Sequence, residues 1–593
     1  MPSSGGPDSR AISQASPAGD AAEANGEGIG RTRPLPWAGS FVEGGRLRDA
    51  RFTAAVPLLL VFGIGAGVWI LWLTRRYDFY ADEWDFVLGV RTWSIGHYFF
   101  PHNEHWSTIP ALIYRLMLQV VGTRSYLPYM SVLMVLHVLT AMLLFLLIRR
   151  RAGDILAFAA GMVLLVLGQA WEDLLWAFQI GFVGACALGL LAILLLTSRP
   201  MPVWKGVLGS LSILGALMMS GPGLVFLVFV GVALIIPADQ RRRVIYLVGP
   251  TTILIVWYVI IGHKGLAHTP ITVGWSASSV DLLHLLLQLV SLGLGTTTAG
   301  LVGLSAQWST LGLVALVLIV GAGWATHRPS SVAIGAGVGL VTEYLLIGLA
   351  DGDKFGDLVT AASRYIYIAA VCLLIILAEV AGQLRWRPAL VPVSAVALMI
   401  VIPINVWVLG QQSVTRYETA IQGGQVSQQV AWTFRDAPGL RRKASVDDSV
   451  MRGHSVRLYL RNRELYGSPL PSLTPAQVGR LPGPLVDRAM NHLLPPHAST
   501  RAATVPESAC VPEPAGGLSV NAGSSVVVRS TAAGFVDVFA SHYAPPSGNP
   551  AASVTLKSLQ DEVSLRMADM GIPFTWHIVL VGPSAAEMLV CPP

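Results

Sequence analysis

AAVPLLLVFGIGAGVWILWL, residues 54–73, is an uncharged run with about the 20 residues that a helix needs to cross a bilayer. Similar runs recur along the chain, for example VLMVLHVLTAMLLFLLI at 132–148. Only 12% of the 593 residues are charged, whereas an ordinary soluble domain carries about 25%. The sequence therefore predicts a polytopic membrane protein that is mainly α-helical.

The apolar runs predict about eleven membrane-spanning helices. Segment 281–304 is also apolar, but Gly and Thr interrupt it, and we expect its first half to form an interfacial or re-entrant helix. The predicted spans lie near residues 53–74, 127–148, 153–168, 176–197, 205–220, 222–237, 243–262, 308–325, 331–349, 365–381 and 389–409.

Basic residues mark one side of the predicted bundle. If the N-terminus is cytoplasmic, the cytoplasmic connections include the run Arg149–Arg151 and the segments DQRRR (239–243) and LRWRP (384–388). This is the positive-inside pattern, to which Arg75 and Arg76 are exceptions. No nucleic-acid-binding motif accompanies the net charge of +6, so we expect no nucleic-acid partner. The pattern predicts a multi-pass protein of the plasma membrane whose C-terminal region is extracytoplasmic.

Composition divides the chain into four parts. Residues 1–50 are small and polar, which predicts a disordered cytoplasmic tail. Residues 51–410 would form the transmembrane bundle, with a long outer loop at 75–126. Residues 411–504 predict an extracytoplasmic region of helices and linkers. Short β-like runs between Gly, Pro and Asn predict a β-sandwich-like extracytoplasmic domain at 505–593.

The four cysteines fall into two groups. Cys186 and Cys372 lie in apolar helices and are most simply buried apolar residues. Cys510 and Cys591 bracket the β-like region and lack the close spacing of a zinc site. Export would favour a disulfide between them, but the sequence leaves that pairing open.

The strongest candidate for chemistry is the acidic segment YDFYADEWDF at 77–86, directly after the first span. Asp78, Asp82, Glu83 and Asp85 would lie close to lipid, which raises the pKa of a carboxyl group. A carboxylate of raised pKa is a suitable general base. The alternative is a solvated acidic loop flanked by interfacial aromatic residues. We expect Asp82 and Glu83 to be catalytic.

Two more groups on the same predicted side are candidates for substrate binding. His102 and His105, in the segment HNEHWS, could bind a phosphate or help to hold a divalent metal, or the segment could simply cap the next helix. Glu172 and Asp173 stand near the start of a span. They could position an acceptor or share a metal, or they could stabilise the helix N-terminus.

A basic group completes the set of candidates. Arg364, followed by Tyr365, stands at the outer mouth of a predicted span, and Lys264 lies on the same predicted side. A guanidinium group can bind a phosphate or diphosphate through two hydrogen bonds. The alternative is a snorkelling arginine anchored by its neighbouring tyrosines.

Together these features resemble the GT-C superfamily of membrane glycosyltransferases. The resemblance covers about residues 50–410 and rests on the apolar first helix, the pair Asp82-Glu83 in a long outer loop with surface helices, and the late outer Arg364. It is most similar to the branch of protein O-mannosyltransferases and bacterial lipid A aminoarabinose transferases. It is also similar to uncharacterised actinobacterial membrane proteins that carry the DEW and HNEHWS segments. The β-like C-terminal region departs from those transferases.

The resemblance implies a polyprenyl-phosphate sugar donor and a glycan, lipid or protein acceptor outside the cytoplasm. The family's loop carboxylate maps onto Asp82 as general base, with Glu83 beside it, and its phosphate-binding basic residue maps onto Arg364. Direct displacement would invert the anomeric centre. No cofactor is clearly required, and a divalent metal stays an open alternative.

Two other functions stay open. A transporter or flippase for polyprenyl lipids or glycans would carry ionisable residues in mid-membrane, and His137 and Glu343 are such residues here. A non-catalytic membrane scaffold that presents the C-terminal domain is the other alternative. The remaining spans are nearly free of charge, and ionisable residues gather at the outer helix ends, which favours chemistry at the surface.

Overall fold

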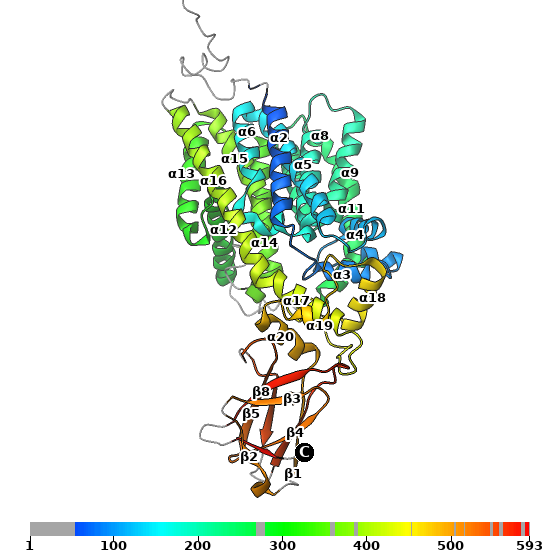
Figure 1. Ribbon diagram of the computed structural model, residues 1–593. Helices are drawn as coiled ribbons and strands as arrows, with labels where there is room; N and C mark the ends of the chain where they lie inside the picture. The colour runs from blue at the N-terminus through cyan, green and yellow to red at the C-terminus, as the bar shows by residue number, and fades with distance from the viewer. Residues whose placement is uncertain are drawn as a thin grey trace, which may run out of the picture.

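The computed structural model shows a helical bundle, a layer of short helices at one end of it, and a β-sandwich beyond that layer (Figure 1). The tail predicted at residues 1–50 lies outside the described residues. The structure describes residues 52, 54–268, 279–355, 362–384, 390–451, 453–502, 506–514, 516–545, 549–556, 561–582 and 588–591.

Apolar helices packed side by side form the bundle (Figure 1). Within the described residues, eight helices are long and apolar enough to cross a membrane, or nine if the bent pair α6–α7 is one span. The eleven spans expected from the sequence are not confirmed, because α6, α9 and α10 have 12, 17 and 14 residues. The bundle contains α2 (Ala55–Leu73), α5 (Leu127–Ala152), α6 (Asp154–Leu165), α7 (Trp171–Leu175), α8 (Ile180–Leu196), α9 (Val203–Met219), α10 (Pro222–Ile235), α11 (Ile245–Ile260), α12 (Ser279–Leu301), α13 (Ser309–Thr326), α14 (Ser331–Phe355), α15 (Ser363–Gln383) and α16 (Leu390–Arg416).

Helix α12 occupies the segment whose crossing is ambiguous in the sequence. It runs antiparallel to α14, because Leu289 lies against Gly348 while Gly293 lies against Tyr344. After α12 the chain turns at Gly303, whose φ of 82° is a left-handed conformation that suits glycine. This turn packs against the middle of α16, so α12 ends among other helices.

Asn405 of α16 joins two helix breaks inside the bundle. Its Oδ1 accepts a hydrogen bond from the backbone N–H of Gly168 (2.9 Å), where the chain passes from α6 to α7. Its Nδ2 donates to the carbonyl of Leu301 (3.2 Å), at the end of α12. Asn405 is fully buried. Backbone groups freed at a helix break need a protein partner where water is excluded, and this one amide serves two breaks.

The loop after α2 and the region after α16 form one layer at the same end of the bundle (Figure 1). The backbone N–H of Ala81 donates to the carbonyl of Val450 (2.7 Å), and that of Thr123 donates to the carbonyl of Tyr466 (3.1 Å). Segments far apart in sequence are therefore hydrogen-bonded to each other. The layer contains α3 (Glu83–Gly89), α4 (Thr108–Val120), α17 (Gln422–Thr433), α18 (Val456–Tyr466), α19 (Pro475–Val478) and α20 (Gly483–Leu493).

Two antiparallel sheets follow, one in the order β1-β7-β4-β9-β2 and the other in the order β3-β8-β5-β6. In β8, side chains alternate between buried and more exposed positions, as expected for a strand with one face on a core. Trp576 is the largest fully buried side chain there. The strands are β1 (His497–Ala502), β2 (Val511–Pro512), β3 (Leu518–Asn521), β4 (Ser525–Ser530), β5 (Gly534–Ser541), β6 (Ala552–Leu556), β7 (Asp561–Arg566), β8 (Thr575–Val581) and β9 (Met588–Cys591).

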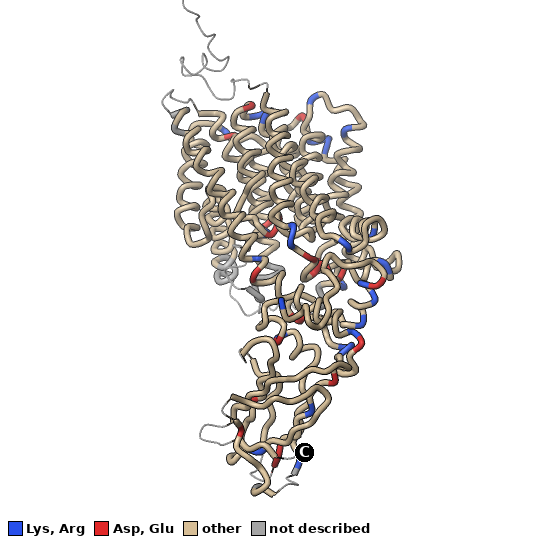
Figure 2. The backbone as a smooth tube through the Cα atoms, viewed as in Figure 1, with Lys and Arg blue, Asp and Glu red and all other residues tan. Residues whose placement is uncertain are grey.

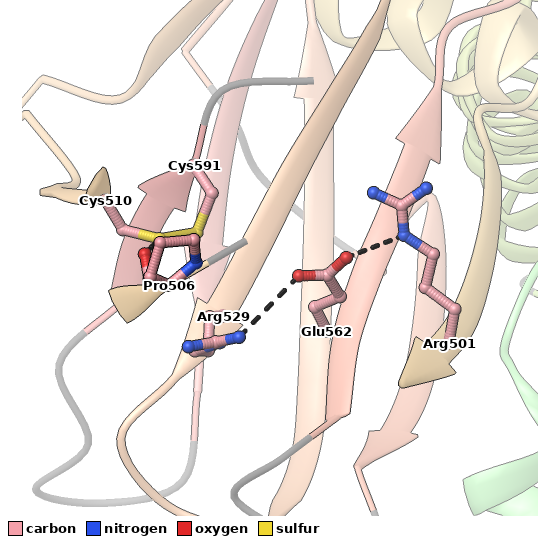
Figure 3. The surroundings of a disulfide bond; sticks show 6 residues. All are labelled: Arg501, Pro506, Cys510, Arg529, Glu562 and Cys591. Atoms are coloured by element: carbon pink, nitrogen blue, oxygen red, sulfur yellow. Dashed lines mark hydrogen bonds and ion pairs between the residues drawn. A yellow bond between two sulfur atoms is a disulfide. The ribbon is translucent and has the colours of Figure 1, made fainter. Parts of the chain in front are cut away.

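The sandwich is held at both its ends. A disulfide joins Cys510, just before β2, to Cys591 of β9, so the pairing left open by the sequence is present (Figure 3). Beside it the buried Glu562 lies between two arginines, at 2.7 Å from Arg501 and 3.8 Å from Arg529. Toward the helical layer, Asp487 of α20 accepts hydrogen bonds from the backbone N–H groups of residues 542–544.

Replacing Asn405 by leucine should destabilise the bundle, although the new side chain is apolar like those around it. The variant leaves the N–H of Gly168 and the C=O of Leu301 without their partner, at a cost of roughly 1–3 kcal/mol per buried group. Thermal unfolding of the detergent-solubilised protein should show a clearly lower midpoint for Asn405→Leu. The matched control Val406→Leu changes an apolar side chain on the same helix and should change the midpoint little. Equal midpoints for both variants would contradict the role of Asn405.

Candidate active site at one end of the helical bundle

Asp82 lies at a tight turn between α2 and α3. The residue before it, Ala81, has a φ of 52°, which is rare for residues other than glycine, and its hydrogen bond to Val450 holds this conformation. The Oδ2 atom of Asp82 accepts a hydrogen bond from Nδ2 of Asn103 (2.6 Å), whose own φ is 47°. Two left-handed residues therefore flank the Asp82 carboxylate. Such strained backbone is concentrated at functional sites.

The surroundings of Asp82 favour a basic carboxylate. Burial raises its pKa above the ordinary value, and the nearby charge of Asp85 acts in the same direction. His102, the hydrogen bond from Asn103 and the charge of Arg364 oppose this increase. Arg364 is thus close enough to lower the pKa of Asp82 through its charge.

Glu83, the neighbour of Asp82, has a different environment. Its carboxylate is fully buried and accepts hydrogen bonds from Tyr114 Oη (2.7 Å), the Tyr80 backbone N–H (3.1 Å) and Tyr126 Oη (3.2 Å). Burial raises its pKa to about 8, although the hydrogen bonds from Tyr114 and Tyr80 oppose the shift. Nearby Asp78 is also buried, and its pKa rises to about 7. Glu83 holds the loop together, whereas Asp82 remains partly exposed.

Glu172 orders the start of the helix that carries Arg364. Its Oε2 accepts a hydrogen bond from the backbone N–H of Arg364 (3.1 Å), and its own N–H donates to Oγ of Ser363 (3.1 Å). Ser363 in turn donates to the carbonyl of Gln169 (2.7 Å). The first N–H groups of a helix lack partners within it. The first turn of α7 therefore supplies a carboxylate that caps α15 from outside.

The residues beside these two occupy different surroundings. The Arg364 guanidinium lies 5.3 Å from the ring centroid of Tyr365, which is buried and stacks on Phe182. Asp173, next to Glu172, is fully buried, and its carboxylate oxygens accept no hydrogen bond from the part of the chain that the structure describes. Asp173 and Tyr365 are therefore buried beside the two residues, whereas Glu172 and Arg364 are partly exposed.

Arg416 is a second cation in this region, which our sequence analysis did not select. Its guanidinium lies 4.7 Å from the ring centroid of Tyr80 and 5.5 Å from that of Trp171, within cation–π distance of both. These aromatic residues belong to the segments that carry Asp82 and Glu172. A π-helical turn at Tyr417–Ile421 follows directly, and such turns often mark functional sites. In the sequence, Arg416 looks like an ordinary basic flank of a span.

Two histidines contact Asp85, three residues from Asp82. His454 Nε2 lies 2.6 Å from Oδ1 of Asp85, and His102 Nε2 lies 3.6 Å from Oδ2. Burial lowers the pKa of His102, while the charge of Asp85 opposes this shift. His105 is joined to His102 by two backbone hydrogen bonds of 2.9 Å. His454 belongs to the layer after α16, so no local sequence motif could have selected it.

The remaining expectations concern Lys264 and a metal. Lys264 is exposed on the short helix η6 (Gly262–His268), which follows α11. In the described ranges, no three His, Cys, Asp or Glu side chains gather as a metal site would require. The geometry supplies one partly exposed carboxylate of raised pKa, Asp82, and two guanidinium groups, a set suited to proton abstraction beside a bound anion.

Comparisons with known proteins find few matches. No protein-family model and no curated protein matches the chain. Among solved structures, the chain is similar to ArnT from Cupriavidus metallidurans, both bound to undecaprenyl phosphate and in the apo state. Each alignment covers 74% of this chain and 92% of that chain at a TM-score of 0.42, with 12% and 13% identity. This similarity is below the level that establishes a common fold.

Glu83 should make stability depend on pH in a defined direction. Its folded-state pKa of about 8 exceeds the ordinary value of 4.5, so folding binds a proton between these two pH values. This part of the stability is therefore present at low pH and is lost as pH rises toward 8. Glu83→Gln keeps an acceptor for the tyrosines but does not titrate. The midpoint of Glu83→Gln minus the midpoint of wild type should therefore be larger at pH 8 than at pH 5.

Glu83→Leu serves as the comparison for this prediction. This variant removes the acceptor of the Tyr114 and Tyr126 hydroxyl groups. The free energy of unfolding should fall by roughly 1–3 kcal/mol for each hydroxyl left unsatisfied. The thermal midpoint should therefore be lower at both pH values. Thermal unfolding in detergent at pH 5 and pH 8 measures all three proteins. The same pH dependence in wild type and Glu83→Gln would show that Glu83 does not titrate in this window.

Proposed function

We propose that this chain is a membrane glycosyltransferase, which moves a sugar from a polyprenyl-phosphate donor to an acceptor hydroxyl at the extracytoplasmic surface. One observation carries the proposal: a carboxylate of raised pKa, Asp82, lies within electrostatic reach of the Arg364 guanidinium at the end of an apolar bundle. Arg416 adds a second cation between the same segments. A base beside cations at a lipid boundary is what transfer from a lipid phosphate requires.

In the proposed reaction the donor's lipid chain lies against the apolar helices and its phosphate binds at Arg364 and Arg416. Asp82 accepts the proton of the acceptor hydroxyl while the hydroxyl oxygen attacks the anomeric carbon. The bond from that carbon to the phosphate oxygen breaks, and the lipid phosphate leaves with the electron pair, stabilised by the guanidinium groups. A single displacement at the anomeric carbon inverts its configuration.

The other residues of the site would act through Asp82, Arg364 and Arg416. Glu172 caps α15 and thereby fixes the backbone of Arg364. Asn103 holds the Asp82 carboxylate through its hydrogen bond, and His102 lies near the adjacent Asp85. We assign His105, Asp173, Tyr365 and Lys264 to the surroundings in which the substrates are positioned.

The proposed orientation places Asp82 and the C-terminal region outside the cytoplasm. Arg149–Arg151 lie in the last turn of α5, and Arg241–Arg243 lie directly before α11, both at the end of the bundle away from the sandwich. Figure 2 shows Lys and Arg at this end and also in the helical layer at the other end. Cytoplasmic ends of spans are enriched in such residues. The Cys510–Cys591 disulfide also favours an oxidising compartment for the sandwich.

Asp82→Asn should abolish sugar transfer while the protein remains folded. The amide keeps the shape of the carboxylate but cannot accept the proton, and loss of a general base typically costs 10²-fold or more in rate. Asp448→Asn is the matched control, because Asp448 is an exposed carboxylate in the layer at the same end. The assay follows purified protein in liposomes with radiolabelled polyprenyl-phosphate sugars and an acceptor glycan or peptide.

The same assay separates the competing functions. Sugar transfer or release that is lost in Asp82→Asn and kept in Asp448→Asn supports the transferase. Translocation of the intact lipid without cleavage would instead indicate a flippase, and neither activity would indicate a scaffold. Full transfer by Asp82→Asn would remove Asp82 from the role of base.

Cysteine labelling tests the proposed orientation. In intact cells, a membrane-impermeant maleimide should label Asp448→Cys but label Arg242→Cys only after permeabilisation, because the two exposed positions lie at opposite ends of the bundle. Wild type is the background control, since Cys186 and Cys372 are buried and the other two cysteines form a disulfide. The reverse labelling pattern would place Asp82 in the cytoplasm and exclude an extracytoplasmic reaction.

A further inference from the structure

A second site candidate lies at the opposite end of the bundle from Asp82. A cavity of about 600 Å³ opens there between the ends of α5, α8, α9 and α15. Among the described residues that line it are four cationic side chains, Arg150, Arg151, Arg199 and Lys205, and one acidic side chain, Glu379. Neither the proposed reaction nor the fold uses this concentration of positive charge.

Neutral groups hold most of these cations in place. Arg150 Nη1 donates to the carbonyl of Leu194 (2.9 Å), and Arg151 Nη1 donates to Oγ of Ser330 (3.2 Å). Lys205 Nζ donates to the carbonyl of Pro200 (3.3 Å). A carbonyl or hydroxyl group orients a cation without neutralising it. Arg150 and Lys205 are therefore positioned while their charge remains available to an anion, whereas Arg151 is also within electrostatic reach of Glu379.

Acidic residues offset only part of the charge. Arg199 forms an ion pair with Asp239, outside the cavity lining. Glu379 accepts hydrogen bonds from the backbone N–H (2.7 Å) and the hydroxyl (2.5 Å) of Ser330, which fixes it on one wall. Two carboxylates against four cations leave a net charge of +2. A cavity of this charge at the end of a membrane bundle suits a phosphate-bearing ligand.

We propose that this cavity binds the phosphate headgroup of an anionic phospholipid from the leaflet at that end of the bundle. Lys205 lies on the first turn of α9. The same helix carries exposed apolar residues at Trp204, Val207, Leu208 and Leu211. This spacing forms one helix face, along which the acyl chains would lie. Trp204 stands at headgroup depth, where tryptophan is enriched. Basic pockets between helices at the cytoplasmic side commonly bind anionic headgroups.

A lipid explains this arrangement better than a free phosphate does. A small anion would use the cations but would have no use for the apolar face of α9, which starts at the cavity. A zwitterionic lipid would bring a positive group into a cavity of net positive charge. The two features together therefore select an anionic lipid. This inference is independent of the reaction at Asp82, because it involves the other end of the bundle.

Native mass spectrometry of the full chain in detergent tests the proposal. Dioleoyl phosphatidylglycerol should bind to wild type, and dioleoyl phosphatidylcholine should bind much more weakly. Each cation near a membrane surface contributes about fivefold to the binding of an anionic lipid. Arg199→Gln combined with Lys205→Gln should therefore weaken phosphatidylglycerol binding roughly 10- to 30-fold. Lys205→Gln alone, which breaks one hydrogen bond, should weaken it about fivefold.

The matched control is Arg241→Gln combined with Arg242→Gln. Both arginines are exposed at the same end of the bundle, and neither lines the cavity. This control should change binding less than twofold, and all variants should elute as wild type does in size-exclusion chromatography. An equal loss of phosphatidylglycerol binding in the control would show that general surface charge, and not the cavity, binds the lipid. Equal binding of phosphatidylcholine, or displacement of the lipid by millimolar inorganic phosphate, would also overturn the proposal.

Discussion

The candidate active site of this protein depends on the buried carboxylate of Glu83. Three donors satisfy it, from Tyr80 in the loop, Tyr114 on α4 and Tyr126 at the start of α5. A buried carboxyl group without such partners would cost several kcal/mol. The same bonds join the loop to two helices and set where α3 begins. Asp82 directly precedes α3. The hydrogen bonds of Glu83 therefore also help to position the Asp82 carboxylate.

The break between α6 and α7 positions Glu172 and, through it, Arg364. Asn405 satisfies the backbone where α6 ends, and this allows the short helix α7 to present Glu172 to the first turn of α15. Glu172 in turn fixes the position of Arg364. The proposed base and the proposed phosphate-binding residue therefore depend on buried polar side chains that satisfy irregular backbone, a requirement that the apolar surroundings impose.

The helical layer after α16 belongs to the site rather than to a separate module. His454 contacts Asp85, and Val450 accepts the hydrogen bond that holds Ala81. The sandwich is joined to this layer through Asp487. At the other end, basic residues line a cavity of their own. The two ends thus each gather cations, which in our two proposals bind a lipid-linked substrate at one end and a structural lipid at the other.

The apolar runs identified a helical membrane protein and most of its spans without further information, because transfer into lipid depends on local composition and length. The same reasoning selected Asp82 and Glu83 as a pair and Arg364 as a basic partner. The spans that it places at α6, α9 and α10 are not confirmed, because the lengths of these helices depend on packing and on breaks. It could not separate the partly exposed Asp82 from the buried Glu83, could not decide whether Cys510 and Cys591 pair, and did not find Arg416 or His454. Those features depend on partners far away in the sequence, and only folding brings such partners within hydrogen-bonding distance.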